Sequence, residues 1–188
     1  SAQADINASL LRRRLERANL DVVARQAEGG KLAAMRSTVV LAALDLRARQ
    51  LALAHCGDSR AYLIRAGAIV RRTVGHSLVQ QMVDGGLLDE EGARQHPQRN
   101  MLLSALGSVD MPPEIVVSEP LPLQAGDVLL LCTDGLWEPL GDACLLAALE
   151  ASTDASQWIE KLDAQVKADA RPGQDNYTAL ALWAHEDE

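Results

Sequence analysis

Apolar residues recur along the chain with two different spacings, which predict helices and strands. From residue 4 to about residue 24 they recur every three to five positions, with Arg and Glu between them, as in an amphipathic helix. Short continuous apolar runs bounded by turn residues predict buried strands. These runs cover residues 37–46, 51–56, 62–65, 68–72, 114–117, 128–132 and 177–183.

Four shorter helices are predicted between the groups of strands. They cover residues 77–83, 89–95, 143–149 and 155–168, the last capped by Ser152 or Asp154. The chain has too many strands for a helical bundle, and its helices alternate with groups of strands. We therefore predict an α/β protein of the α+β type, with mainly antiparallel sheets, in a single domain over residues 1–188.

Composition narrows the classes of partner. The chain has 188 residues, 48% of them hydrophobic, and no apolar run approaches the length of a membrane span, so we expect a soluble globular protein. The net charge of -8 argues against a nucleic-acid or anionic-membrane surface, because either needs a basic footprint. Three cysteines with no close pair indicate reduced thiols and a cytoplasmic location.

Three aspartates lie at the ends of predicted strands. Asp58 and Asp134 follow the runs 51–56 and 128–132, and Asp175 precedes the run 177–183. Carboxylates at strand ends can converge at the rim of a sheet, where they repel each other unless a cation neutralises them. Oxygen ligands of this kind suit Mg²⁺ or Mn²⁺. The sequence therefore predicts a metal site.

The motifs around these aspartates resemble a known family. Gly-Asp-Ser-Arg at 57–60, Cys-Thr-Asp-Gly-Leu at 132–136 and Gln-Asp-Asn-Tyr-Thr at 174–178 occur in the order found in metal-dependent serine/threonine protein phosphatases, the PPM family. The stretch 76–107 is similar to the flap of the compact bacterial members. The resemblance extends from the first helix to the last strand.

This resemblance implies a fold, a chemistry and a set of partners. The fold would be a four-layer sandwich of two antiparallel sheets flanked by helices. In it, two Mn²⁺ or Mg²⁺ ions share a water that attacks phosphoserine or phosphothreonine of a protein substrate, which a cognate kinase has phosphorylated. Asp134 and Asp175 would be catalytic ligands of the binuclear centre, and Asp58 would hold a third, weaker ion. Asn176 and Gly135 would orient these ligands without binding the ions themselves.

The chain departs from the family pattern at its beginning. It contains neither the Arg followed by Asn-Glu-Asp, which holds the phosphate, nor the Asp-Gly-x-Gly-Gly whose Asp bridges both metals; residues 84–86 match the glycines only superficially. We therefore expect an N-terminally truncated catalytic domain that is weak or inactive alone. Its uncovered sheet edges would favour a homodimer. Smaller departures are Arg36 and Gly75, where the family has Gly and often Asp.

Several residues have a purely structural alternative. Asp58 could cap its turn or pair with Arg60, and Asn176 could satisfy backbone groups before the last strand. His76 and His96 have no acidic or cysteine partner at ligand spacing, which favours solvated or structural imidazoles. The whole chain could likewise be a catalytically silent phosphatase-like domain that binds a partner.

A cysteine-dependent phosphatase loop is rejected on spacing. The sequence His-Cys-Gly-Asp-Ser-Arg at 55–60 places three residues between Cys56 and Arg60, whereas such a loop needs about five for its amides to surround a phosphate. The preceding strand would also bury the sulfur rather than lower its pKa.

Overall fold

The computed structural model describes residues 8–109, 111–169 and 173–185, and these residues form two compact units. The first unit combines the described residues of Ser1–Ser59 and Val74–Pro122, and the second combines those of Arg60–Thr73 and Leu123–Glu188. Each unit therefore contains two separate stretches of chain, and each has its own sheet, helices and apolar core. No helix within the described ranges is long and apolar enough to cross a membrane.

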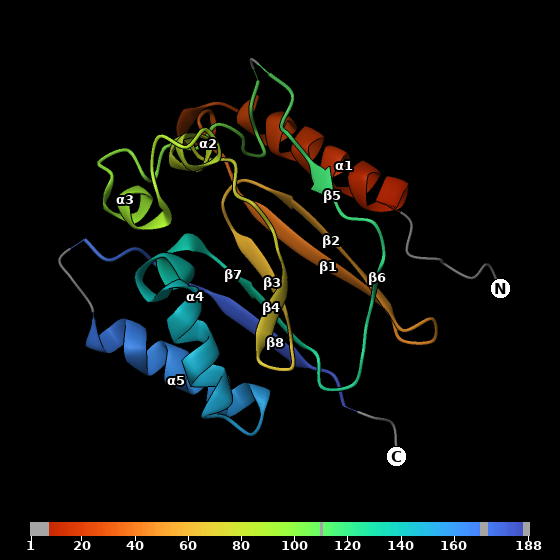
Figure 1. Cartoon of the computed structure of the whole chain (residues 1–188). Coiled ribbons are helices and arrows are strands. Elements are labelled where there is room, and N and C mark those ends of the chain that lie inside the picture. The colour runs from red at the N-terminus through yellow and green to blue at the C-terminus, as the bar shows by residue number, and fades with distance from the viewer. Residues whose placement is uncertain (1–7, 110, 170–172, 186–188) are drawn as a thin grey trace. The chain divides into compact units, whose positions relative to one another are not determined.

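The first unit has an antiparallel sheet centred on β2, which pairs with β1 on one side and with β5 and β6 on the other (Figure 1). Its strands are β1 (Val39–Asp45), β2 (Gln50–Cys56), β5 (Val116–Val117) and β6 (Leu121–Pro122). Its helices are α1 (Ala8–Gln26), the 3₁₀ turn η1 (Gly30–Leu32), α2 (Leu78–Asp84) and α3 (Glu90–Gln95).

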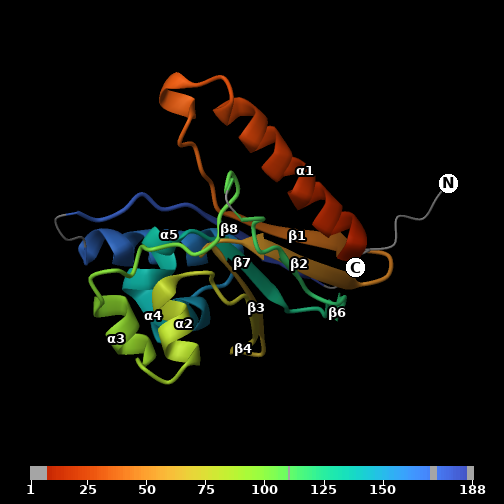
Figure 2. The same cartoon turned by 90° about the horizontal axis from the view of Figure 1, so that it is seen from above.

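Helix α1 packs on one face of this sheet (Figure 2). Its buried Leu11 and Leu15 contact a strand face made of Ala52, Ala54 and Cys56. These small side chains let the helix approach the sheet closely, which explains why an aliphatic chain without phenylalanine can still form a dense core.

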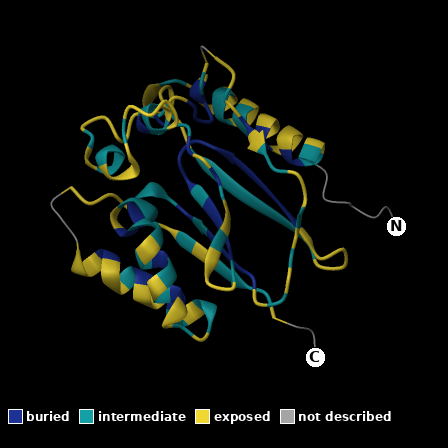
Figure 3. Cartoon of the chain, in the orientation of Figure 1, coloured by how far each residue is buried: buried dark blue, intermediate teal, exposed yellow. Residues whose placement is uncertain are grey.

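The second unit has an antiparallel sheet in the order β4-β3-β7-β8. Its strands are β3 (Arg60–Arg65), β4 (Ala68–Arg72), β7 (Val128–Cys132) and β8 (Ala179–Trp183), and its helices are α4 (Asp134–Glu150) and α5 (Ala155–Ala168). Both helices pack on one face around the fully buried Trp158, whose indole Nε1 donates to the Leu145 carbonyl at 3.1 Å. Figure 3 shows that their outward faces are exposed.

Most of the predicted elements are confirmed. The structure has two antiparallel sheets with helices, as the α+β prediction requires, and β7 and α5 have the predicted bounds. Asp154, rather than Ser152, caps α5 by accepting a hydrogen bond from the Gln157 N–H at 2.9 Å. Residues 4–7 of the predicted first helix lie outside the described residues.

Two boundaries near the predicted site are wrong. Helix α4 consists of two helical pieces separated at Gly141, whose φ of 67° and ψ of 167° are not helical. The second piece contains the predicted helix 143–149, whereas the first piece, which begins at Asp134 and includes Pro139, was not predicted. Strand β8 begins at Ala179 rather than at residue 177, so a three-residue segment separates Asp175 from the strand. The short elements η1 and β6 were not predicted.

Candidate metal centre

The candidate site begins where two neighbouring strands share an edge of the second sheet. Because β7 and β8 are antiparallel, the end of β7 lies beside the start of β8, and Cys132 is paired with Ala179. Two hydrogen bonds continue this pairing past the strands: the Thr133 N–H donates to the Thr178 carbonyl at 3.1 Å, and the Thr178 N–H donates to Thr133 Oγ1 at 3.0 Å. The two aspartate motifs are therefore guided toward each other.

Asp134 is the first residue of α4, where the positive end of the helix dipole favours an anion. Its Oδ1 accepts a hydrogen bond from the Gly135 N–H at 2.9 Å. Burial nevertheless raises the pKa of Asp134, and the nearby Asp175 carboxylate raises it further. The two carboxylates predicted to act together are therefore close enough to repel each other, and a bound cation would relieve that repulsion.

Gly135 allows the loop that carries Asp175 to lie against the start of α4. A Cβ atom at position 135 would overlap the Asn176 carbonyl oxygen and would lie 3.2 Å from the Asp175 carbonyl oxygen. The loop is fixed by Gln174 Nε2, which donates to the Gly135 carbonyl at 3.1 Å, while the Asn176 N–H donates to Asp175 Oδ1 at 2.8 Å. Asn176 thus acts on the site partly through its backbone.

A cation–π contact fixes the first turn of α4 to β3. The Arg60 guanidinium carbon lies 3.4 Å from the centroid of the Trp137 ring, and Arg60 Nη1 donates to the Tyr62 hydroxyl at 3.3 Å. The sequence indicated Arg60 only as a partner for Asp58 or as part of a rejected phosphate loop. Its contact with an aromatic residue of the Asp134 motif could not be read from the spacing.

Asp58 belongs to the first unit, in the turn that follows β2, and is 8% exposed. Gly57 in this turn has a positive φ of 99°, which favours glycine. Close approach also explains Gly75, because a Cβ there would lie 3.2 Å from the Asp58 Cα. Arg36 is not among the described residues with a positive φ, so this departure from the family strains no turn.

Cys56, directly before this turn, is fully buried, and burial raises the pKa of its thiol. A thiol with a raised pKa is a poor nucleophile at neutral pH. The rejection of a cysteine-dependent mechanism is therefore supported by the structure as well as by the spacing.

The chemistry of the Asp134–Asp175 pair fits a hard divalent ion, since both side chains offer carboxylate oxygens. Water molecules commonly complete the coordination of an ion held by one or two carboxylates. Among the described residues, no group of three or more His, Cys, Asp or Glu side chains could hold a metal. The pair would therefore provide part of a ligand set.

The two antiparallel sheets with helices belong to the α+β fold class, and the carboxylate pair lies where two strands of one sheet share an edge. The chain belongs to the SpoIIE/PPM-type family of serine/threonine phosphatases: the pattern of the family described as stage II sporulation protein E (SpoIIE) matches residues 2–184. The resemblance inferred from the three motifs is confirmed.

One relative is the serine/threonine protein phosphatase PstP of Mycobacterium tuberculosis, which is 38% identical over 123 residues. That match covers 64% of this chain but only 23% of the relative, so the chain spans less than a quarter of that protein.

Two solved structures are similar to almost the whole of this chain. The phosphatase Stp1 of Staphylococcus aureus has a TM-score of 0.82 at 26% identity, covering 99% of this chain and 72% of Stp1. The catalytic domain of PstP in complex with two manganese ions has a TM-score of 0.76 at 25% identity, covering 96% of this chain and 72% of that one. Both likenesses confirm the fold class, and the second shows that a relative binds manganese.

Three residues that shape the candidate site were not predicted from the sequence: Thr133, Gln174 and Trp137. Each lies within one of the three acidic motifs or next to one, so their proximity to Asp134 and Asp175 was visible. Their contacts were not, because each one joins segments far apart in the sequence, such as Gln174 and Gly135.

Proposed function

We propose that this chain forms the larger part of a catalytic domain that hydrolyses phosphoserine and phosphothreonine in proteins with the help of Mn²⁺ or Mg²⁺. The observation that carries the proposal is the pairing of Asp134 with Asp175 at one sheet edge, where burial and mutual repulsion raise the pKa of Asp134. Membership of the phosphatase family and the manganese complex of PstP support it. A single phosphatase-like domain fits a family match that runs from residue 2 to residue 184.

In this proposal, the residues of the chain hold and orient the ions. Asp134 and Asp175 would supply carboxylate oxygens to a binuclear centre. Gly135 and Asn176 would keep the start of α4 and the loop that carries Asp175 in register, and Asp58 would help to hold a third ion. Divalent ions bound in this way lower the pKa of a coordinated water and stabilise the charge that develops on the phosphoryl group.

The donor set explains why we expect low activity from these 188 residues alone. With two clustered carboxylates and no third His, Cys, Asp or Glu beside them among the described residues, water would have to complete the coordination, and the site would hold its ions weakly. Weak metal affinity would leave few molecules with both ions in place at ordinary Mn²⁺ concentrations.

The partners follow from the same proposal. The substrate would be a cytoplasmic phosphoprotein, and a serine/threonine kinase would oppose the reaction in a signalling pathway. β1 and β8 lie at sheet edges, and the exposed Leu180 in β8 adds apolar surface. Such edges favour pairing with another strand, so we also propose a homodimer through one of them.

Calorimetric titration with Mn²⁺ and hydrolysis of a phosphothreonine peptide test the proposal together. We expect Mn²⁺ binding that Asp134→Asn weakens at least tenfold, and hydrolysis that requires Mn²⁺. The control Asp169→Asn changes an exposed carboxylate at the end of α5 and should leave both unchanged.

Three outcomes are informative. No Mn²⁺ binding by the wild-type chain would favour the alternative of a catalytically silent, partner-binding domain. Binding without hydrolysis would support a site that holds metal but lacks phosphate ligands. Rapid hydrolysis by these 188 residues, comparable with that of longer family members, would contradict the expected low activity.

A further inference from the structure

We propose that His76 is a positioning residue for Asp58, acting through the backbone of Gly57. This inference rests on the proposed role of Asp58 in holding an ion. His76 lies 19 positions after Gly57 and directly before α2, so it would connect the start of that helix to the turn that carries Asp58. The proposal gives a function to a histidine for which the sequence offered no partner.

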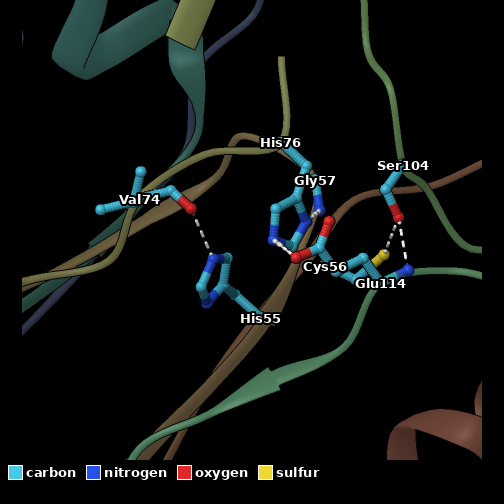
Figure 4. Close-up of polar contacts among 7 residues, drawn as sticks. All are labelled: His55, Cys56, Gly57, Val74, His76, Ser104 and Glu114. Carbon is cyan, nitrogen blue, oxygen red and sulfur yellow. Dashed lines mark hydrogen bonds and ion pairs between the residues drawn. The ribbon is translucent and has the colours of Figure 1, made fainter. Parts of the chain in front are cut away.

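His76 contacts Gly57 at two points (Figure 4). The Gly57 N–H donates to His76 Nδ1 at 3.2 Å, and the His76 N–H donates to the Gly57 carbonyl at 3.0 Å. One residue therefore satisfies both backbone groups of Gly57. Because the next residue is Asp58, movement of this backbone would move the carboxylate.

The opposite side of the turn is also held. A Cβ on Gly57 would lie 2.5 Å from the Thr38 Cγ2, so the glycine backbone is pressed against that side chain. Thr38 Oγ1 lies 2.9 Å from Ser59 Oγ, at hydrogen-bond distance. With His76 on one side and Thr38 on the other, the turn has little freedom to move.

The imidazole itself is fixed in one orientation and one tautomer. Its Nδ1 accepts a hydrogen bond, so a neutral ring carries its proton on Nε2, which faces the Glu114 carboxylate at 4.0 Å. The ring stacks on His55, with 4.8 Å between centroids and 18° between planes. His55 is held in turn by its Nε2, which donates to the Val74 carbonyl at 2.7 Å.

Burial supports this assignment, since the His76 side chain is only 9% exposed and desolvation lowers the pKa of its imidazole. The neutral ring keeps the Nδ1 lone pair available to the Gly57 N–H. The same segment also anchors α2, because the Ser77 side chain accepts a hydrogen bond from the Gln80 N–H at 3.2 Å. The segment 74–77 thus serves the turn and the helix together.

Two substitutions separate the positioning role from simple filling of space. His76→Asn keeps an acceptor close to the place of Nδ1, whereas His76→Gln places its amide close to Nε2. Both remove the stacked ring, so they share the loss of packing against His55. His96→Gln is the control, because His96 is only half-buried and its Nδ1 accepts a local hydrogen bond from the Gln98 N–H.

The first readout needs no metal: NMR monitors the hydrogen exchange of the Gly57 amide in the whole 188-residue chain. We expect exchange about tenfold faster in His76→Gln and within about threefold of wild type in His76→Asn and His96→Gln. The Leu130 amide, in the other unit, reports whether each variant is folded. Equal exchange of Gly57 in the Asn and Gln variants would overturn the proposal.

The second readout uses Mn²⁺ alone as a paramagnetic probe of the Asp58 amide signal. We expect the Gln variant to need several-fold more Mn²⁺ than the Asn variant for the same broadening. Equal broadening in the two variants would overturn the positioning role. If Mn²⁺ fails to broaden Asp58 even in the wild type, the ion-holding role of Asp58 is wrong, and the exchange result still reports separately on the hydrogen bond.

Discussion

Asp58 and Asp134 occupy equivalent places in the two units but are held in different ways. Each lies two residues after a buried cysteine that ends a central strand, Cys56 in β2 and Cys132 in β7. After β7 a helix begins at once, and Asp134 is held by the first amides of that helix. After β2 the chain turns instead, and Asp58 depends on contacts from residues distant in sequence.

This difference shows what each position requires of the sequence. A carboxylate at a helix start is oriented mainly by a local motif, because the helix supplies a favourable dipole, and the contacts of Gln174 and Arg60 with the first turn of α4 add to this. A carboxylate in a turn needs clamps, here Thr38 on one side and His76 on the other. Substitutions at the glycine beside each aspartate test the comparison most directly.

Gly57→Ala should have the largest effect on stability. The new Cβ would meet Thr38 at a positive φ, so we expect a loss of about 3 kcal/mol from backbone strain and overpacking together, measured by urea unfolding. The matched control is Gly67→Ala, where φ is 75° but no neighbouring atom lies within 4 Å of the added Cβ. There we expect the free energy of unfolding to fall by about 1 kcal/mol. Equal losses would show that Thr38 does not confine the turn.

Gly135→Ala should be less destabilising but more harmful to metal binding. The Cβ would overlap the Asn176 carbonyl and push the Asp175 loop away, so we expect a loss of about 2 kcal/mol. We also expect at least tenfold weaker Mn²⁺ affinity by calorimetry, because the two carboxylates would separate. Gly92→Ala, where the nearest neighbour is the Asp89 side chain at 3.0 Å, should leave Mn²⁺ binding unchanged.

Arg60→Ala tests whether the start of α4 has an external clamp of its own. Loss of the cation–π contact with Trp137 should lower the free energy of unfolding by about 1 to 2 kcal/mol. A double-mutant cycle with Trp137→Leu isolates the contact, and a coupling energy of about 1 kcal/mol is expected. No measurable coupling would mean that the helix start is held by local bonds alone.

Asp134→Asn should stabilise the metal-free chain slightly while weakening Mn²⁺ binding. The pKa of Asp134 is raised in the folded chain, so the folded chain binds more protons than the unfolded chain between the two pKa values. The free energy of unfolding therefore falls as the pH rises from the unfolded pKa of 3.8 through the folded pKa. Above that window we expect the variant to be more stable by about 0.5 kcal/mol in EDTA, as judged by thermal unfolding across pH. A variant less stable than wild type at neutral pH would contradict this sign.

The sequence predicted most elements, and the proximity of Asp134 and Asp175, because strand runs and the residues at their ends are local signals. The run 128–132 is continuously apolar, and α5 has a regular amphipathic pattern with a cap, so both were predicted with correct bounds. The start of α4 was not, because Gly135, Pro139 and Gly141 interrupt the helical pattern for reasons of packing and geometry. The role of His76 was hidden too, since its partner is a glycine backbone with no side-chain signal.

The interleaving of the two units has a consequence for the order of folding during synthesis. The β3–β4 hairpin joins strands that are neighbours in sequence, but β3 acquires its second neighbour only when Ile64 can pair with Val128. β2 waits likewise for Val116 and Leu121. Closing such long loops is entropically costly and slow. A nascent chain therefore carries two incomplete sheets until residues 116–132 have been synthesised.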